Sequence, residues 1–351
     1  MEIGIGLDQS LRLSFADQRR LVREAAELGY PSAWTNSGGV GRDIFQICGQ
    51  WWNASAEAVD GGIITGVSVL PVLYWSVASL AAAAATTAEI TGGRFVLGLG
   101  GTLTNAALRR RFNLPDAPPI SAMREYLISL RELLTGGVVE RSGKAVELHG
   151  AQLAFQPPAV PLYVGALGPQ MLRLAGELSD GAALNWCSPE QIAWSRERVA
   201  EGARRAGRDP AAVRIAEYIR VCVDDDEDAA RRAMTRAILG YALREPGAPK
   251  DRGYRAHFGR MGFDEPLSEL EARRDAGASA DEIIEAFPRE LLRMVGYFGP
   301  AAEAAAAFHR LAEGLDVAIV RVVPARPGVG AVEAVLRACR PGLETSAGSG
   351  R

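Results

Sequence analysis

The chain has 351 residues, of which 48% are hydrophobic and 23% are charged, and its formal net charge is −3. This size and composition fit one large α/β domain, because barrels of this length commonly form without division. The slightly acidic balance argues against a protein that binds nucleic acid or an anionic membrane surface. No apolar run reaches the ~18 residues that a membrane span needs, so we expect no membrane partner.

Cysteine and histidine usage argues against a disulfide scaffold and a metal centre. The four cysteines are scattered without a C-x-x-C pair, and the three histidines lack metal-ligand spacing. The chain opens directly with the strand-like IGIGL rather than with a basic and apolar leader. We therefore expect a cytoplasmic protein with reduced thiols and without a metal site.

Short apolar strands alternate with helices along the chain. The expected strands cover Ile3–Leu7, Ser32–Thr35, Ile63–Leu70, Phe95–Leu99, Leu162–Gly165, Gly181–Leu184, Val213–Val223 and Val317–Val323. The helices expected after them cover Phe15–Leu28, Asp43–Ala58, Ser76–Ile90, Ala122–Leu134, Gly168–Ser179, Pro189–Ala206, Glu227–Leu243 and Val329–Cys339. Ser14 before the first helix and Gly29 after it are typical capping residues.

Eight strand–helix units predict the fold class. Strict alternation implies parallel strands joined by right-handed crossovers, and eight such units close as a (β/α)8 TIM barrel. A doubly wound open sheet is the alternative. We expect one barrel domain over residues 1–341, with insertions near 138–158 and 244–298. The first insertion is expected to be a hairpin that turns at Ser142-Gly143, and the tail over 342–351 is expected to be disordered.

The stretch Thr91–Thr104, TGGRFVLGLGGTLT, places glycines where a strand leaves the sheet. Small residues at such an exit let the backbone approach a flat or phosphorylated ligand. A dinucleotide-binding turn would need G-x-G-x-x-G, and that fingerprint fails because Leu103 occupies its third glycine position. The stretch is therefore interpreted as a barrel strand whose C-terminal end lines the active site.

The other C-terminal strand ends supply the rest of the expected site. The residues at all these ends are Asp8 and Gln9, Asn36 and Ser37, Ser68–Leu70, Gly98–Thr104, Ala166–Gln170 and Asn185–Ser188. Only Asp8 among them is ionised. This mixture suits a flat and mostly uncharged ring better than a hydrolytic site with paired carboxylates.

The segment Val164–Gln170, VGALGPQ, runs from a strand into a Gly-Pro pair that opens a helix. Pro169 suits a first helical position, and the free N–H groups and dipole of such a helix end favour a phosphate. The next strand exit, Asn185–Ser188, would complete this cradle. The plain alternative is a tight strand–helix loop without a ligand.

Three segments together resemble the luciferase-like superfamily. They are RFVLGLG after an alanine-rich helix, SVLP in the third strand, and PLYVGALGPQMLRLAGELSDGAALN from Pro161 to Asn185. The last is most similar to the branch that uses the 5-deazaflavin coenzyme F420, such as methylenetetrahydromethanopterin reductases and F420-dependent glucose-6-phosphate dehydrogenases. The resemblance extends from Glu2 to about Leu336. It implies a (β/α)8 barrel with an insertion and F420 as cofactor, with FMN as the alternative.

The resemblance also implies site residues at the matching positions. It implies a non-prolyl cis peptide bond at Ser68–Val69 that backs the deazaflavin ring, and a phosphate site after the fifth and sixth strands. A homodimer is expected, since members of the superfamily commonly pair. The residues implied in cofactor binding are Asn36, Ser37, Val67, Ser68, Val69, Gly100, Gly101, Thr102, Leu167, Gly168, Gln170, Trp186, Cys187 and Ser188.

Two positions depart from the sugar-phosphate and alcohol dehydrogenases of this branch. Asn36-Ser37 stands where they carry Asp-His, and Leu103 stands where they carry a Glu. Alcohol oxidation needs a base beside the substrate hydroxyl. We therefore expect reduction of a polarised C=C or C=N bond by hydride transfer. Asp8 and Asn36 are the catalytic candidates, and the proton comes from Asp8, a tyrosine or water.

Two other functions stay open on the sequence. An FMN-dependent monooxygenase of the superfamily must shield a flavin peroxide from water and usually places His or Cys near the ring, whereas Cys187 falls in the phosphate region. The other open function is that of a non-catalytic member that binds a flavin or another ligand without turnover.

The second insertion is expected to cover the pocket and set specificity, and it contains Tyr254, His257, Phe258 and Phe263.

Overall fold

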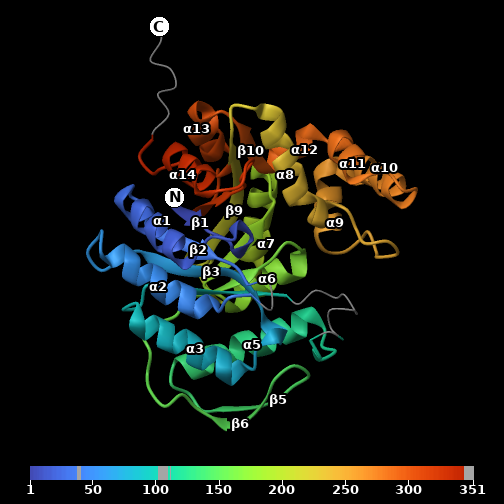
Figure 1. The fold of residues 1–351 in the computed structure, drawn as a ribbon. Helices are drawn as coiled ribbons and strands as arrows, with labels where there is room; N and C mark the ends of the chain where they lie inside the picture. Colours follow the sequence, from blue (N-terminus) through green and yellow to red (C-terminus); the bar gives the residue numbers. More distant parts are fainter. Residues whose placement is uncertain (38–40, 102–109, 111, 344–351) are drawn as a thin grey trace.

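Eight parallel strands close into a barrel in the computed structural model, which describes residues 1–37, 41–101, 110 and 112–343 (Figure 1). Pairing of β9 with β8 and β11, and of β11 with β1, closes the ring. The prediction of a TIM barrel rather than an open sheet is confirmed. In order around the ring the strands are β1 (Glu2–Gly6), β2 (Ser32–Thr35), β3 (Ile64–Pro71), β4 (Phe95–Gly100), β7 (Leu162–Gly165), β8 (Gly181–Asn185), β9 (Arg214–Val223) and β11 (Val317–Val322).

A helix follows each barrel strand and packs on the outside of the ring. These helices lie close to the predicted ranges. They are α1 (Phe15–Glu27), α2 (Ile44–Ala56), α3 (Val77–Ile90), α5 (Pro119–Leu134), α6 (Pro169–Leu178), α7 (Pro189–Arg205), α8 (Glu227–Ala242) and α14 (Val329–Ala338). No helix in the described part of the chain is both long and apolar enough to cross a membrane.

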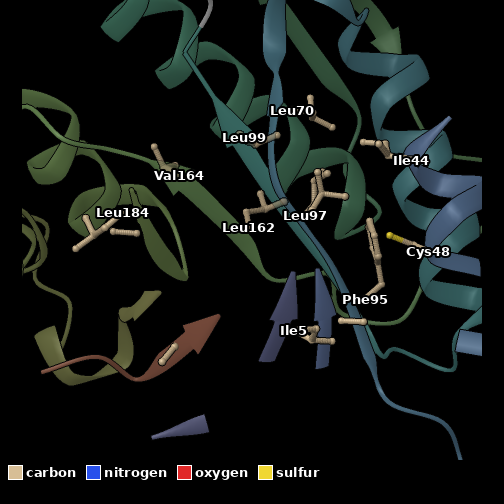
Figure 2. Close-up of a cluster of buried hydrophobic side chains, with 14 of the residues drawn as sticks. Ile5, Ile44, Cys48, Leu70, Phe95, Leu97, Leu99, Leu162, Val164 and Leu184 are labelled. Carbon is tan, nitrogen blue, oxygen red and sulfur yellow. The ribbon is translucent and has the colours of Figure 1, made fainter. Parts of the chain in front are cut away.

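The main hydrophobic core lies between the outward side chains of the strands and the inner faces of the helices. Successive strand residues point to opposite faces, so every second residue of each strand reaches this layer. Figure 2 shows Ile44 and Cys48 of α2 facing Leu70 of β3 and Phe95 of β4, and all four are buried. Burying each large aliphatic side chain contributes about 1.5–3 kcal/mol to stability. This layer holds the strand ends in fixed positions.

A ninth parallel strand, β10 (Gly296–Gly299), lies beside the ring and is followed by α13 (Ala301–Leu311). It pairs with the last four residues of β9, beyond the level at which β8 stops pairing. The sequence pattern predicts neither element, because it assigns residues up to 298 to a helical insertion. With four residues, two of them glycine, β10 has a weak intrinsic preference for a strand.

The first insertion is an antiparallel hairpin of β5 (Val139–Ser142) and β6 (Glu147–Ala151), which lies beside α3 and α5 in Figure 1. The N–H of Gly143 donates to the carbonyl oxygen of Val146 at 2.8 Å, which confirms the predicted turn. The carboxylate of Glu125 in α5 accepts hydrogen bonds from the backbone of the turn, including Val146 N at 3.0 Å. The hairpin is thereby attached to the barrel's outer layer.

The second insertion lies between α8 and β10 and is built of short helices gathered on one side of the barrel (Figure 1). They are α9 (Gly253–Phe258), a π-helical turn (Gly259–Phe263), α10 (Asp264–Asp275), α11 (Ala280–Ala286) and α12 (Arg289–Val295). Their apolar side chains, such as Leu267 and Leu291, share one buried cluster with Met234 of α8 and Phe298 of β10. The insertion therefore packs on the barrel as a continuous body.

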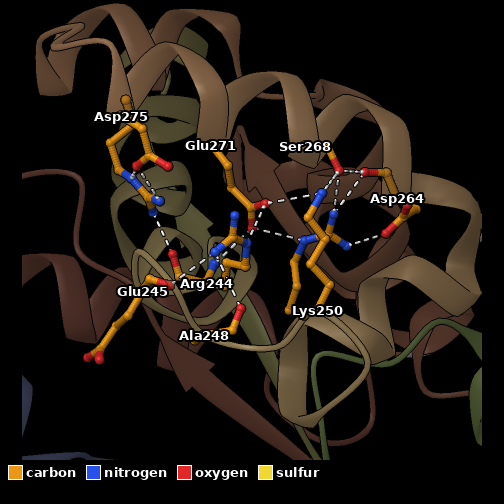
Figure 3. A network of polar contacts seen from close by, with 10 residues as sticks. Arg244, Glu245, Ala248, Lys250, Asp264, Ser268, Glu271 and Asp275 are labelled. Atoms are coloured by element: carbon orange, nitrogen blue, oxygen red, sulfur yellow. Dashed lines mark hydrogen bonds and ion pairs between the residues drawn. The ribbon is translucent and has the colours of Figure 1, made fainter.

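A buried carboxylate holds α9, α10 and the segment after α8 together (Figure 3). Glu271 is 2% exposed. Its Oε1 accepts a hydrogen bond from Nε of Arg255 at 3.0 Å, and its Oε2 accepts one from Nε of Arg244 at 3.2 Å. Arg255 also donates to Asp264 Oδ1 at 2.8 Å and to Ser268 Oγ at 2.9 Å. Removing one partner of such a network leaves a buried charge without compensation.

Three side-chain contacts attach the insertion to the exits of β7 and β8. His257 Nε2 donates to the carbonyl oxygen of Trp186 at 2.8 Å, and Arg260 Nη2 donates to that of Leu167 at 3.0 Å. Asn185 Nδ2 donates to the hydroxyl of Tyr254 at 2.6 Å. Burial lowers the pKa of His257 to about 4, and the charge of Arg260 acts in the same direction. His257 is therefore neutral in the folded protein at neutral pH.

Glu271→Gln tests the network in the insertion. Glutamine keeps the size of the side chain, but it replaces one acceptor oxygen with an NH2 donor and removes the buried negative charge that faces Arg244 and Arg255. We expect the free energy of unfolding, measured with urea, to fall by about 3 kcal/mol. Glu269→Gln, on an exposed position of the same helix, is the matched control. A loss equal to that of the control would contradict the assigned role.

His257→Gln tests the docking contact through pH. The unfolded state takes up a proton on His257 below its ordinary pKa near 6.5, whereas the folded state does so only near 4. Stability is therefore lost as pH falls from 6.5 to 4, by up to ~3 kcal/mol from this group. Urea unfolding at pH 7.5 and 4.5 should show a smaller loss in the variant than in the parent chain. His309→Gln, on half-buried α13, controls for removal of an imidazole, and an unchanged difference would count against this assignment.

Candidate active site

Aromatic side chains fill the barrel interior below its C-terminal end. Trp34, Tyr163 and Tyr218 form a buried cluster with Val96 and Ile319. The rings of Trp34 and Tyr163 lie 6.2 Å apart. A ligand must therefore bind above this floor, at the C-terminal strand ends, which we call the mouth.

One side of the mouth is shaped by a bulge in β3, whose register against β4 shifts after Val67. The peptide bond Ser68–Val69 is cis, which confirms the bond that the resemblance implies. The side chain of Val69 points into the barrel. A Cβ built on Gly100 would lie 2.6 Å from one methyl group of Val69, and a Cβ built on Gly165 would lie 3.3 Å from each of its two methyl groups.

The glycines that end β4 make room for this bulge. A Cβ on Gly98 would overlap the carbonyl oxygen of Val67, so a side chain there would push β3 away. Gly101 is exposed, and its Cβ position lies 4.0 Å from the methyl group of Met171 in α6. This side of the mouth is therefore a smooth apolar surface of one valine and glycine backbone. The predicted cofactor residue Thr102 lies outside the described residues, as does Leu103.

The exits of β1 and β2 lie next to the bulge. Ser37 N donates to the carbonyl oxygen of Val69 at 3.2 Å. Gln9 Nε2 donates to the carbonyl oxygen of Asn36 at 3.3 Å, and Gln9 Oε1 accepts from Arg42 N at 2.8 Å. The structure thus brings the predicted residues Asn36, Ser37 and Val69 together at one edge of the mouth.

The opposite side of the mouth carries charged side chains. β9 and β11 stand across the ring from β3 and β4 in the strand order. Asp8, just beyond β1, forms a buried ion pair with Arg321 of β11. The guanidinium of Arg321 lies 5.6 Å from the ring centroid of Tyr218. Burial alone would lower the pKa of Arg321, but Asp8 and the hydroxyl of Tyr241 raise it.

The side of the mouth that carries Asp8, Arg321 and Arg220 is called the charged wall. Arg220 of β9 is its second arginine and is 1% exposed. Its Nη1 donates to Asn185 Oδ1 and, at 2.9 Å, to the carbonyl oxygen of Tyr218. Its guanidinium lies 3.9 Å from the ring centroid of Trp186. Its Nη2 has no hydrogen-bond partner among the described residues. Burial and then the like charge of Arg321 lower the pKa of Arg220 to about 9.

Aromatic residues of α8 and α9 cover this wall. The ring of Tyr241 lies 5.9 Å from that of Trp186 and 4.7 Å from that of Tyr254. Burial raises the pKa of Tyr254 to about 12, so its phenol keeps its proton. Tyr254 lies against Asn185 and Tyr241 at the exit of β8, whereas Phe258 and Phe263 are buried in the cluster that the insertion shares with α8 and β10. The role of the insertion in specificity stays a prediction.

Trp186, Cys187 and Ser188, three predicted cofactor residues, are at most 3% exposed. Glu217 Oε1 accepts a hydrogen bond from Cys187 N at 2.6 Å, and burial raises the pKa of Glu217 to about 8. Ser188 Oγ caps α7 by accepting from Gln191 N at 3.3 Å. Ser188 also borders a separate cleft of about 290 Å³ between α7, β10 and α13. The side chains of Cys187 and Ser188 face protein rather than the mouth, whereas the buried ring of Trp186 stacks on Arg220 at the mouth.

The N-terminus of α6 offers an anion site. Gly168 is its N-cap without a side-chain cap, Pro169 is its first residue, and a Cβ on Gly168 would meet nothing within 4 Å. The predicted residue Gln170 is exposed. Because Arg260 binds the carbonyl oxygen of Leu167, its guanidinium lies beside this helix end. Free N–H groups, the helix dipole and a cation all favour a phosphate there.

Sequence reasoning named Asp8 but missed its partner Arg321, and it missed Arg220 and Arg260. A signal existed in β9, where Glu217 and Arg220 interrupt an otherwise apolar run, as Arg321 does in β11. A charge inside a barrel strand is costly to bury, so its presence marks a candidate site. In the described part of the chain, no group of three or more His, Cys, Asp or Glu could hold a metal ion.

Comparison with known proteins identifies related chains. The model of a family described as luciferase-like monooxygenase matches residues 3–317. The 5,10-methylenetetrahydromethanopterin reductase of Archaeoglobus fulgidus is 31% identical over 226 residues, which cover 63% of this chain and 68% of the relative. The F420-dependent glucose-6-phosphate dehydrogenase of Rhodococcus erythropolis is 29% identical over 204 residues, which cover 56% of this chain and 59% of the relative.

Solved structures share the fold. The F420-dependent tetrahydromethanopterin reductase of Methanopyrus kandleri superposes with a TM-score of 0.77 at 22% identity over 97% of both chains. The monooxygenase RslO1 of Streptomyces bottropensis superposes with a TM-score of 0.67 at 18% identity, also over 97% of both. Since the family model spans most of the sequence, the chain belongs to the luciferase-like family, and its relatives place it with the F420-dependent oxidoreductases of that family.

Proposed function

We propose that this chain uses coenzyme F420 to reduce a polarised C=C or C=N bond of a small organic substrate. The inward-facing Val69 is the observation that chiefly supports this proposal, because it offers a flat apolar surface bounded by Gly98, Gly100 and Gly165. Such a surface suits one face of a deazaflavin ring. The F420-dependent relatives make F420 the coenzyme to expect, with FMN as the alternative.

The proposed coenzyme contacts divide between ring and phosphate. When bound, F420 supplies or accepts a hydride, while the protein supplies position and electrostatics. Trp186, Cys187 and Ser188 act by shaping the exit of β8. The residues assigned to the ring are Asn36, Ser37, Val67, Ser68, Val69, Gly100, Gly101 and Thr102, and those assigned to the phosphate are Leu167, Gly168, Gln170 and Arg260.

The exit of β2 lacks the base that alcohol oxidation would need there. Oxidation needs a base beside the hydroxyl, and Asn36 and Ser37 provide none. Asp8 is the one carboxylate that faces the mouth in the described part of the chain, and it is held by Arg321. His257 is turned to the carbonyl oxygen of Trp186.

Reduction requires a proton and a group that binds the substrate's heteroatom. Apart from its ion pair with Arg321, the buried carboxylate of Asp8 makes no hydrogen bond within the described residues, and the proposal assigns it the proton transfer to the substrate. The amide of Asn36 donates a hydrogen bond to the heteroatom. Tyr254, whose hydroxyl accepts from Asn185, is the second proton donor at the mouth.

The coenzyme assignment is tested by fluorescence titration with F420 and, in parallel, with FMN. We expect tight binding of F420 and weak binding of FMN. Arg260→Gln should weaken F420 binding about ten-fold, because it removes a charged contact from the phosphate, and should leave binding of the phosphate-free deazaflavin unchanged. Arg252→Gln, exposed at the start of α9, is the matched control. Preferential binding of FMN would instead assign the chain to the monooxygenase side of the family.

The catalytic assignment is tested with Asp8→Asn. With reduced F420 and electron-poor alkenes or imines, we expect kcat to fall roughly 100-fold because the proton relay is lost. F420 affinity should stay within about two-fold. Asp60→Asn, at an exposed position, is the control. Unchanged turnover would exclude Asp8 as proton donor, and a parent chain inactive with every substrate would indicate a non-catalytic binder.

The homodimer, the cytoplasmic location and the single domain over residues 1–341 stay predictions. Gel filtration with light scattering tests the first, and a monomer mass would contradict it.

A further inference from the structure

Positive and negative charges in the charged wall are unequal in number. Arg220 and Arg321 lie close enough for each to feel the other's charge. Asp8 is paired with Arg321, whereas no carboxylate within the described residues forms an ion pair with Arg220, and Glu217 is bonded to the backbone N–H of Cys187. Of the residues outside the described ranges, only Glu344 is acidic. The wall therefore carries one positive charge in excess.

The hydrogen bonds of Arg220 are also incomplete. Nη1 has two oxygen partners, and stacking on Trp186 covers one face of the guanidinium, but Nη2 has none within the described residues. A buried donor without a partner is costly, and a buried unpaired charge is costlier still. An arginine in this state is commonly completed by a bidentate oxyanion.

The position of the arginines indicates what the oxyanion belongs to. β9 stands across the ring from β3, so Arg220 faces the surface of Val69 from the other side of the mouth. A molecule held between the coenzyme ring and this wall would present one end to each. The phosphate position at α6 is separate, since it lies at the exit of β7 beside Arg260.

From this geometry we infer that the substrate carries a carboxylate, which Arg220 and Arg321 bind while the reducible bond faces the coenzyme. This inference rests on the proposed function for the reaction, but the anion site can be measured independently of it. Asp8 occupies Arg321 in the absence of substrate and competes with the carboxylate. Tyr254, carried by the insertion, covers the bound group.

Crotonate and crotonamide test the inference, because they share size and a conjugated C=C bond but differ in charge. Both are titrated calorimetrically into the complex of the chain with F420. We expect crotonate to bind at least ten-fold more tightly than crotonamide. Arg321→Gln and Arg220→Gln should bring this ratio close to one. Arg326→Gln, beyond β11 and 69% exposed, should leave it unchanged.

Asp8→Asn separates a binding role from a merely structural one. It removes the competing carboxylate, so the preference for crotonate should increase several-fold even as turnover falls. Arg220→Gln removes a stacked buried side chain, so the fold of this variant is checked by circular dichroism. If the Arg220→Gln variant does not fold, Arg321→Gln and Asp8→Asn decide the test.

Three results would overturn the inference. One is equal affinity for acid and amide in the parent chain, and another is an undiminished ratio in both arginine variants. The third is a loss of F420 affinity in these variants with the ratio unchanged, which would assign the arginines to the acidic tail of the coenzyme. If the chain binds FMN instead, the same ratio measured in the FMN complex still decides the anion site, although the proposed function fails.

Discussion

The position of the Val69 side chain inside the barrel is the constraint on which the mouth depends. A branched side chain at this level fits only because the neighbouring strands β4 and β7 carry Gly98, Gly100 and Gly165. Forcing even one additional carbon into such contacts typically costs about 1–3 kcal/mol. The apolar side of the mouth is therefore fixed in shape, and any flat ligand placed there inherits its orientation. The charged groups of the mouth lie on the other side.

That other side combines strong electrostatics with low exposure. Arg220 and Arg321 lie in an interior where charges interact far more strongly than in water. Asp8 compensates one of them, and the ring of Trp186 partly compensates the other. The aromatic roof of Tyr241 and Tyr254 excludes water from the same region, which strengthens every one of these interactions. The proposed ligand, with an apolar face and an anionic end, matches this distribution of apolar and charged groups.

The fold could be predicted from the sequence because its signals are local. Each barrel strand is a short apolar run closed by a turn signal, and the exits with Gly98, Gly100 and Gly168 are visible as glycine patterns. The bond at Ser68–Val69 was predictable only from resemblance. β10 was not, because its short glycine-containing run is stabilised by pairing with the protruding end of β9.

The charged wall could not be assembled from the sequence, for a different reason. Asp8 and Arg321 come from opposite ends of the chain, and the partners of Arg220 come from β8. Which strand residues face inward, and which of them meet, follows from closure of the ring rather than from any local pattern. The burial of Trp186 was likewise unpredictable, because it depends on how the insertion packs against the exit of β8.

The manner in which the insertion is attached bears on how this fold acquires new specificities. Two of the polar contacts that join it to the exits of β7 and β8, those from His257 and Arg260, end on the main-chain carbonyl oxygens of Trp186 and Leu167. Every residue type supplies such an oxygen, so substitutions in the barrel loops preserve these two contacts. The covering segment can thus diverge in sequence while the strand exits that hold it stay as they are. Under the proposed function, this lets the part that covers the substrate vary independently of the barrel that holds the coenzyme.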